Sequence, residues 1–183
     1  MANKIKLFLY FFICISSTIF CQESKYPAGI IYGPKAAFKI DAPSGWILDN
    51  KSGLSNGLHC VLYLNKYSWK DSPVVMYAKI ASTEFENVDT FIVFAIKSYL
   101  KQDSNFIYNK YATKKINEKD SAIIYDYYGG PYYNFERVAY IQVPKAVCYI
   151  VFSSINKESF DSYSNDLLNV VKTFIYKPEY INY

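Results

Sequence analysis

The sequence predicts an α+β sandwich, in which one mainly antiparallel sheet of about six or seven strands is packed by two amphipathic helices. Apolar residues alternate with polar ones along several short segments, whereas in two longer segments they recur every three or four residues. The links between the later strand-like segments are short, and short links join only antiparallel neighbours. Because a helix with one apolar stripe must bury it, we expect both helices to cover the sheet.

The first half of the chain contains strand-like segments that are apolar, β-branched or aromatic and are bounded by polar breaks. They are Ala37–Ala42, Leu58–Leu64 and Val74–Ala81. The first is followed by a turn at Pro43-Ser44-Gly45 and then Trp46, which we expect in the core. A further connection carries Tyr67 and Trp69.

The spacing of apolar residues then changes and predicts a helix over Val88–Gln102. Asn87 is a suitable N-cap for this helix, and Asp89 places a carboxylate in its first turn, where the helix dipole favours a negative charge.

Four more strand-like segments follow, and a second helix closes the pattern. Residues of both alternating sets are apolar in the last strand, so we expect that strand to be covered on both faces. A helix follows over Lys157–Tyr176, with Asn156 as its candidate N-cap. The four strands are Phe106–Ile116, Ala122–Tyr128, Asn134–Val143 and Val147–Ile155.

Residues 1–21 have the plan of a secretory signal peptide, because two early lysines precede an unbroken apolar run from Leu7 to Ile15. The alternative is an uncleaved anchor, but the run is shorter than the ~20 apolar residues that a membrane span prefers. A lipid anchor at Cys21 is disfavoured because bulky Phe20 precedes it. We therefore expect a periplasmic or secreted protein whose mature domain does not insert into a membrane.

The length of 183 residues fits one domain. We expect a flexible lead-in over 22–35, a single domain over 36–176 and a tail over 177–183. The net charge is only +4, which excludes a dedicated polyanion binder, so no nucleic-acid partner is expected.

The order of the motifs resembles that of PsbP-like and DcrB-like proteins. The stretch Phe38-Lys-Ile-Asp-Ala-Pro-Ser-Gly-Trp46 is similar to their first strand and the turn after it, and Arg137–Tyr140, Val147–Ser153 and Val170–Phe174 follow their strand, strand, closing-helix order. The resemblance implies an α/β/α sandwich and an exported or organellar accessory or binding protein without shared catalytic residues. The tyrosine-rich hairpin departs from the pattern, so the resemblance implies no specific partner.

The sequence lacks the motifs of common catalytic sites and cofactor sites. His59 is the only histidine, and Cys60 beside it should point to the opposite face of a strand, so the two cannot form a catalytic pair. We expect no catalytic residue, no cofactor and no metal site. Cys60 and Cys148 can form a disulfide in an exported domain, or they can remain two separately buried thiols.

The most distinctive segment is a hairpin with five tyrosines in nine residues: Tyr125, Tyr127, Tyr128, Tyr132 and Tyr133. These rings can form a recognition surface for an unknown protein or glycan partner, or they can pack across the strands. Arg137 can join this surface by binding an anionic group, or it can pair with an acid such as Asp126.

The sequence thus predicts an exported, non-catalytic binding or accessory protein of the cell envelope. One alternative is a small envelope hydrolase that uses carboxylates. The other is a docking subunit of an envelope assembly, with the hairpin as its docking edge.

Overall fold

The fold is described here from a computed structural model, which covers residues 29–130 and 133–181. The predicted signal peptide over 1–21, Cys21 and Tyr132 lie outside the described residues, so what concerns them stays a prediction.

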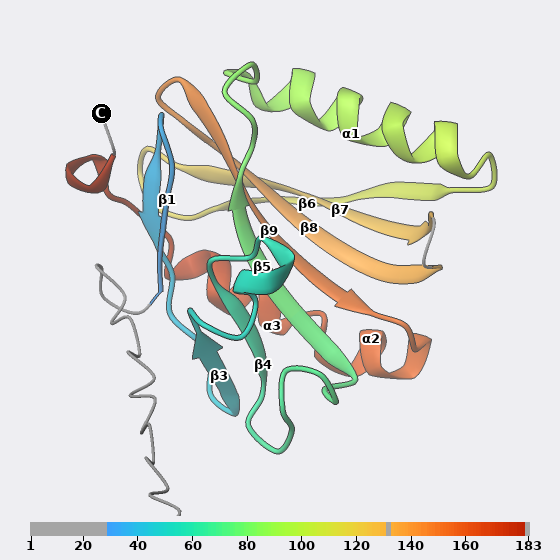
Figure 1. The fold of residues 1–183 in the computed structure, drawn as a ribbon. Helices are drawn as coiled ribbons and strands as arrows, with labels where there is room; N and C mark the ends of the chain where they lie inside the picture. Colours follow the sequence, from blue (N-terminus) through green and yellow to red (C-terminus); the bar gives the residue numbers. More distant parts are fainter. Residues whose placement is uncertain (1–28, 131–132, 182–183) are drawn as a thin grey trace, which may run out of the picture.

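A seven-stranded antiparallel sheet forms the centre of the fold (Figure 1). The four strands that the second half of the sequence predicts are consecutive neighbours in it, as their short links require. From one edge to the other, the strands are β3 (Trp46–Asp49), β4 (Val61–Leu64), β5 (Val74–Ile80), β9 (Ala146–Ser154), β8 (Asn134–Val143), β7 (Ser121–Gly129) and β6 (Ile107–Lys115).

A small three-stranded sheet stands beside the large one and is formed by β1 (Ile30–Tyr32), β2 (Ala37–Lys39) and β10 (Ile175–Tyr176). Strand β1 lies within the segment predicted as a flexible lead-in, so the expected domain boundary at residue 36 is too late. The reason is packing: the side chains of Ile30 and Ile31 are buried, and β1 pairs with β2 in antiparallel register.

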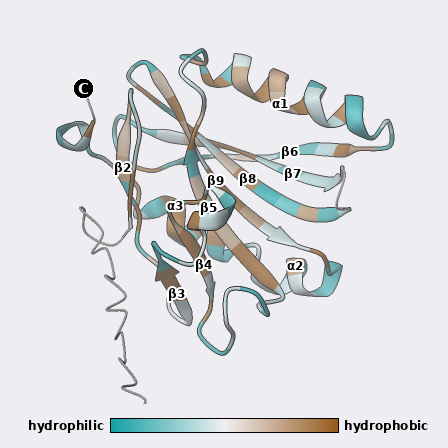
Figure 2. Ribbon diagram, viewed as in Figure 1, coloured by the Kyte–Doolittle hydropathy of each residue, from teal (hydrophilic) through white to brown (hydrophobic). Residues whose placement is uncertain are grey.

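Helix α1 (Val88–Gln102) lies along one face of the large sheet, and α2 (Lys157–Tyr163) and α3 (Asp166–Lys172) lie on the other (Figure 1). The predicted α+β sandwich is therefore confirmed. Asn87 caps α1 as expected, because its side-chain oxygen accepts a hydrogen bond from the Thr90 N–H at 3.1 Å. Hydrophobic and hydrophilic segments alternate along α1, as an amphipathic helix requires (Figure 2).

The single closing helix predicted over Lys157–Tyr176 is wrong, because the structure has two short helices and then strand β10. The break falls at Ser164 and Asn165, residue types whose side chains compete with helical hydrogen bonds. The last residues, Ile175 and Tyr176, pair with β2 instead of continuing the helix. Two 3₁₀ turns, at Leu54–Asn56 and Pro178–Tyr180, complete the described elements.

Strand β9 is covered on both faces, as its apolar composition predicts. On the α2/α3 side its Phe152 and Ile150 are fully buried in an aliphatic and aromatic core. On the α1 side its Val151 packs in a second cluster that is rich in tyrosine. The two faces of the sheet therefore bury different kinds of side chain.

Strand β6 forms one edge of the large sheet and is mostly exposed. A register shift between Lys110 and Ala112 places Tyr111 in a bulge, and the strand ends at Lys114 and Lys115. Bulges and lysines are two devices by which proteins protect a free sheet edge. Within the part of the chain that the structure describes, no helix is both long and apolar enough to cross a bilayer.

Candidate functional site

The hairpin tyrosines do not share one surface, because successive residues of a strand point to opposite faces of a sheet. Tyr125 and Tyr127 belong to the cluster beneath α1. Tyr128 lies on the other face and stacks on Phe135, with ring centroids 4.4 Å apart. Tyr133 is 67% exposed next to the hairpin turn.

Tyr125 and Tyr127 contribute packing beneath α1. Tyr127 is only 3% exposed, and its hydroxyl lies 2.9 Å from that of Tyr140. Its ring stacks with those of Tyr125 and Phe106, at centroid distances of 5.9 and 5.4 Å. Cross-strand packing, the alternative weighed from the sequence, accounts for both of these tyrosines.

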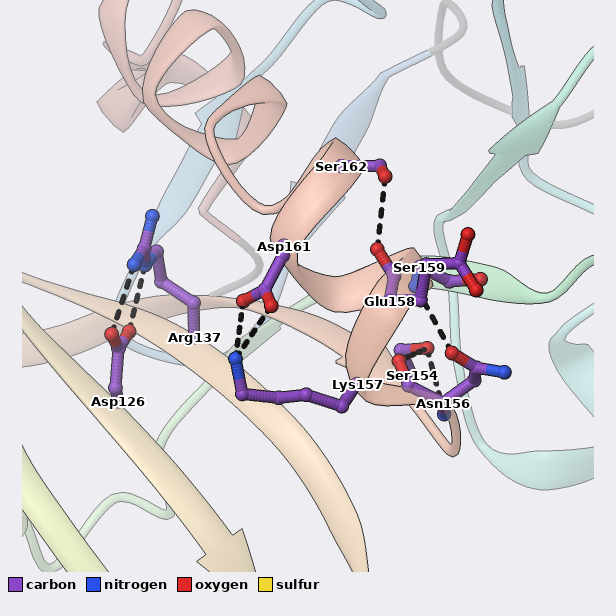
Figure 3. A network of polar contacts seen from close by, with 9 residues as sticks. All are labelled: Asp126, Arg137, Ser154, Asn156, Lys157, Glu158, Ser159, Asp161 and Ser162. Atoms are coloured by element: carbon purple, nitrogen blue, oxygen red, sulfur yellow. Dashed lines mark hydrogen bonds and ion pairs between the residues drawn. The ribbon is translucent and has the colours of Figure 1, made fainter.

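Arg137 pairs with Asp126, as one of the two sequence hypotheses proposes (Figure 3). Its Nε and Nη2 atoms donate to the two carboxylate oxygens at 2.7 and 2.9 Å, and its Nη1 donates to Asn165 Oδ1 at 3.0 Å. The guanidinium also lies 3.6 Å from the ring centroid of Tyr111. The residue is 5% exposed, and its bond to Asn165 connects the sheet to the break between α2 and α3.

A groove of about 460 Å³ opens over this ion pair. Its floor includes Asp126, Tyr128 and Arg137, and the exposed pair Lys157–Asp161, 2.6 Å apart, lies at its rim (Figure 3). We call it the Arg137 groove. Three nitrogens of Arg137 already donate hydrogen bonds to protein oxygens. The floor of the groove therefore has few donors left to bind an anionic ligand.

Cys60 and Cys148 are free and buried. Cys60 accepts a hydrogen bond from Ala78 of β5, and Cys148 lies opposite Ile80 of the same strand, so β5 runs between the two cysteines. Two inter-strand spacings separate them by about 10 Å, whereas a disulfide needs Cα atoms within ~7 Å. The disulfide alternative is therefore wrong, and Cys60 and Cys148 are two separately buried thiols.

His59 is exposed, while the neighbouring Cys60 is buried, which agrees with the opposite orientations expected from a strand. The imidazole lies 5.9 Å from the ring centroid of Tyr32. Among the residues described, no group of three or more His, Cys, Asp or Glu side chains could hold a metal ion.

The most developed candidate site is a cavity of about 500 Å³ on the α1 side of the sheet, which we call the Glu136 cavity. Strands β5, β8 and β9 form its floor, and the C-terminal half of α1 and two loops form its walls. It is lined by Asn56, Leu58, Trp69, Val75, Tyr77, Tyr99, Gly129, Asn134, Glu136 and Ser153. Glu136 is its only acidic residue, and none of these residues is Lys, Arg or His.

Burial raises the pKa of Glu136, and hydrogen bonds from Ser153 and Asn134 lower it in part. Burial also raises the pKa values of Tyr77 and Tyr99, and the charge of Glu136 adds to both shifts. The cavity therefore holds neutral phenols around one carboxyl group that resists ionisation.

Asn134 lines this cavity, and its amide is held by Ser153. Its Nδ2 donates to Ser153 Oγ at 3.0 Å, which leaves Oδ1 as the other polar atom of the amide. Within the described residues, Oδ1 is buried without a hydrogen-bond partner. Such atoms are rare in folded proteins, and because Oδ1 is buried it does not face the open space of the cavity.

Sequence reasoning missed Glu136, although a signal for it exists. Glu136 alternates with Val138 and Tyr140 on the face of β8 that turns toward α1, so an acid interrupts a row of buried residues. It also missed Asn134 and Tyr99 as site residues. Trp69 was named as a loop aromatic, and it lines the Glu136 cavity.

Comparison with solved structures identifies the fold. LpqN of Mycobacterium tuberculosis, described as involved in cell envelope biogenesis, is similar to this chain with a TM-score of 0.52 at 11% identity, over 81% of this chain and 90% of LpqN. Cyanobacterial PsbP from Synechocystis sp. PCC 6803 has a TM-score of 0.49 at 11% identity, over 76% and 86% of the two chains. The likeness to LpqN agrees with the α+β sandwich expected from the sequence. No family model matches the sequence, and no curated protein sequence matches it.

Proposed function

We propose that this chain is an exported, non-catalytic binding protein of the cell envelope, which holds a small ligand in the Glu136 cavity. The observation that carries the proposal is the cavity itself. A volume of about 500 Å³ lies within the ~300–1,000 Å³ typical of small-molecule sites, and aromatic walls with a few fixed polar groups are typical of them as well. The envelope setting is supported by the signal-like segment at residues 1–21 and is compatible with the description of LpqN.

A cavity-filling substitution tests this proposal. Val75→Trp places a large ring among the lining residues, and Ile155→Trp adds the same ring at a position that is 78% exposed. A small-molecule screen by thermal shift should find compounds that stabilise the wild type and Ile155→Trp but not Val75→Trp. A ligand at 100 times its Kd stabilises by about 2.7 kcal/mol, which raises Tm by about 5 °C or more in a domain of this size. Compounds that stabilise all three proteins equally would contradict the cavity as the site.

A hydrolase remains the second candidate function, because a carboxyl group with a raised pKa is a suitable general acid. A glycosidase needs two carboxyl groups beside the scissile bond, whereas Glu136 is the only acid among the cavity-lining residues. We therefore expect no turnover of glycan, ester or phosphoester substrates. Turnover that is lost in Glu136→Gln would favour the hydrolase instead.

A further inference from the structure

We propose that the Glu136 cavity binds a primary ammonium group that is carried on an apolar body. This inference rests on the proposed function, since it names the ligand class of the same cavity. It is argued from the acceptors, the aromatic rings and the missing counter-charge around Glu136.

The charged acceptor in the cavity is the carboxylate of Glu136, which offers two oxygens. Ser153 and Asn134 donate hydrogen bonds to this carboxylate and hold it in place. An ammonium group carries three donors and no acceptor, and it therefore complements the carboxylate.

Aromatic side chains line the same cavity. Trp69, Tyr77 and Tyr99 reach the cavity from a loop, from β5 and from α1. Aromatic faces attract cations, most strongly where water is excluded, and they also cover an apolar ligand body. Rings and carboxylate together favour a cation over an anion of the same shape.

Among the described residues, no cation pairs with Glu136. The titratable groups that interact with its charge are the phenols of Tyr77 on β5, Tyr99 on α1, Tyr127 on β7 and Tyr140 on β8. Burial raises the pKa of each of these phenols, so they stay neutral at physiological pH. The ion pairs found among the described residues do not include Glu136.

Charged residues of the adjoining loop lie outside the cavity. Lys66, Lys70 and Asp71 belong to the loop that carries Trp69, but they are exposed and do not line the cavity. A buried carboxylate without a counter-charge is costly in such a place. A bound ammonium removes that cost, which neither a neutral nor an anionic ligand can do.

The test uses three probes with one apolar body: phenethylamine, 2-phenylethanol and phenylacetate. Each is titrated into the ¹⁵N-labelled protein, and binding is followed by NMR shifts of the residues that line the cavity. At pH 8 we expect the amine to bind at least tenfold more tightly than the alcohol, and the acid to bind most weakly. Affinity for the amine should fall as the pH drops and Glu136 takes up a proton, whereas affinity for the alcohol should not.

Glu136→Gln keeps the shape of the side chain and removes its charge, so it should weaken amine binding at least tenfold and leave the alcohol unchanged. Glu118→Gln makes the same change at an exposed turn and is the control. Equal affinities for amine and alcohol, or amine binding that survives Glu136→Gln, would overturn the ammonium proposal and leave a binding cavity. If no probe binds, the ammonium proposal fails, and the screen with Val75→Trp still decides the proposed function separately.

Discussion

At the scale of single residues, Glu136 and Arg137 are neighbours on β8 that face opposite sides of the sheet and have opposite surroundings. Arg137 has a carboxylate, an amide and aromatic rings as partners. Glu136 has hydrogen-bond donors as partners, and in the part of the chain that the structure describes it has no cation. Arg137 therefore stabilises the fold, whereas an ionised Glu136 destabilises it by a free energy that a cationic ligand can offset.

The raised pKa of Glu136 makes the stability of the free protein depend on pH. The folded state holds the proton more tightly than the unfolded state, so stability falls as pH rises from the ordinary Glu value of 4.5 through the raised folded value. Glu136→Gln removes this dependence. We expect its Tm to exceed that of the wild type at pH 7–8, and the difference to vanish below about pH 4.

Thermal unfolding between pH 3.5 and pH 8 measures this difference, with Glu118→Gln as the exposed control. Parallel pH profiles for the wild type and Glu136→Gln would show that Glu136 ionises freely in the folded protein.

Loss of Arg137 should destabilise the protein, because it leaves Asp126 without its bidentate partner. Breaking a fully buried pair costs about 3–5 kcal/mol; the side chain of Asp126 is 30% exposed and can take up water, so we expect Arg137→Leu to cost about 2 kcal/mol. Chemical denaturation of Arg137→Leu, Asp126→Asn and the double variant measures the coupling between them. Lys157→Met, which breaks an exposed pair on the same groove, is the control and should change stability little.

At the scale of elements, hydrophobic period predicts most strands and helix α1, because each of these elements buries one face. Hydrophobic period fails where tertiary contacts determine where an element begins or ends. The Arg137–Asn165 bond and the pairing of Ile175 with β2 divide the closing helix, and neither contact leaves a local signal. Strand β1 is not predicted either, because Ile30–Tyr32 is too short to show a hydrophobic period.

The cap of α1 is a testable element-scale feature. Asn87→Ala removes the acceptor for the Thr90 N–H and should cost about 1 kcal/mol, which lowers Tm by about 2–4 °C. Thermal unfolding followed by circular dichroism measures the change. Asn105→Ala, at an exposed position outside any helix, serves as the control; if both variants lose the same Tm, the cap does not contribute.

At the scale of the whole molecule, the sandwich buries Cys60 and Cys148 on either side of β5, and both of these thiols should be inert in the native protein. Burial raises the pKa of Cys60 to about 12 and that of Cys148 further, and the thiolate is the reactive form. Without any reductant, iodoacetamide should leave both cysteines unmodified in the native protein and alkylate both after denaturation. Peptide mapping by mass spectrometry distinguishes this result from a disulfide, which would block alkylation in both states.

The fold class could be predicted from the sequence, but the candidate site could not. The alternation of residues in β7 and β8 was visible, yet only the assembled sheet shows that Tyr127 and Tyr128 serve different faces. The Glu136 cavity is formed by β5, β8, β9, α1 and two loops. The hydrophobic period along the sequence predicts each element but not which elements lie next to one another. The pair of Arg137 with Asp126, on the opposite face of the sheet, is predictable as one of two alternatives, because a lone arginine can pair with an acid on a neighbouring strand.

The exposed edge at β6 limits how this molecule can meet another chain. To add an eighth strand, a partner would have to follow a backbone that shifts register at Tyr111, and would have to settle beside Lys110, Lys114 and Lys115. Only a segment with carboxylates at matching positions and a complementary kink satisfies both demands. Ordinary extended peptides, including further copies of β6 itself, would meet repulsion and mismatch there, which keeps this side of the sheet free from indiscriminate growth.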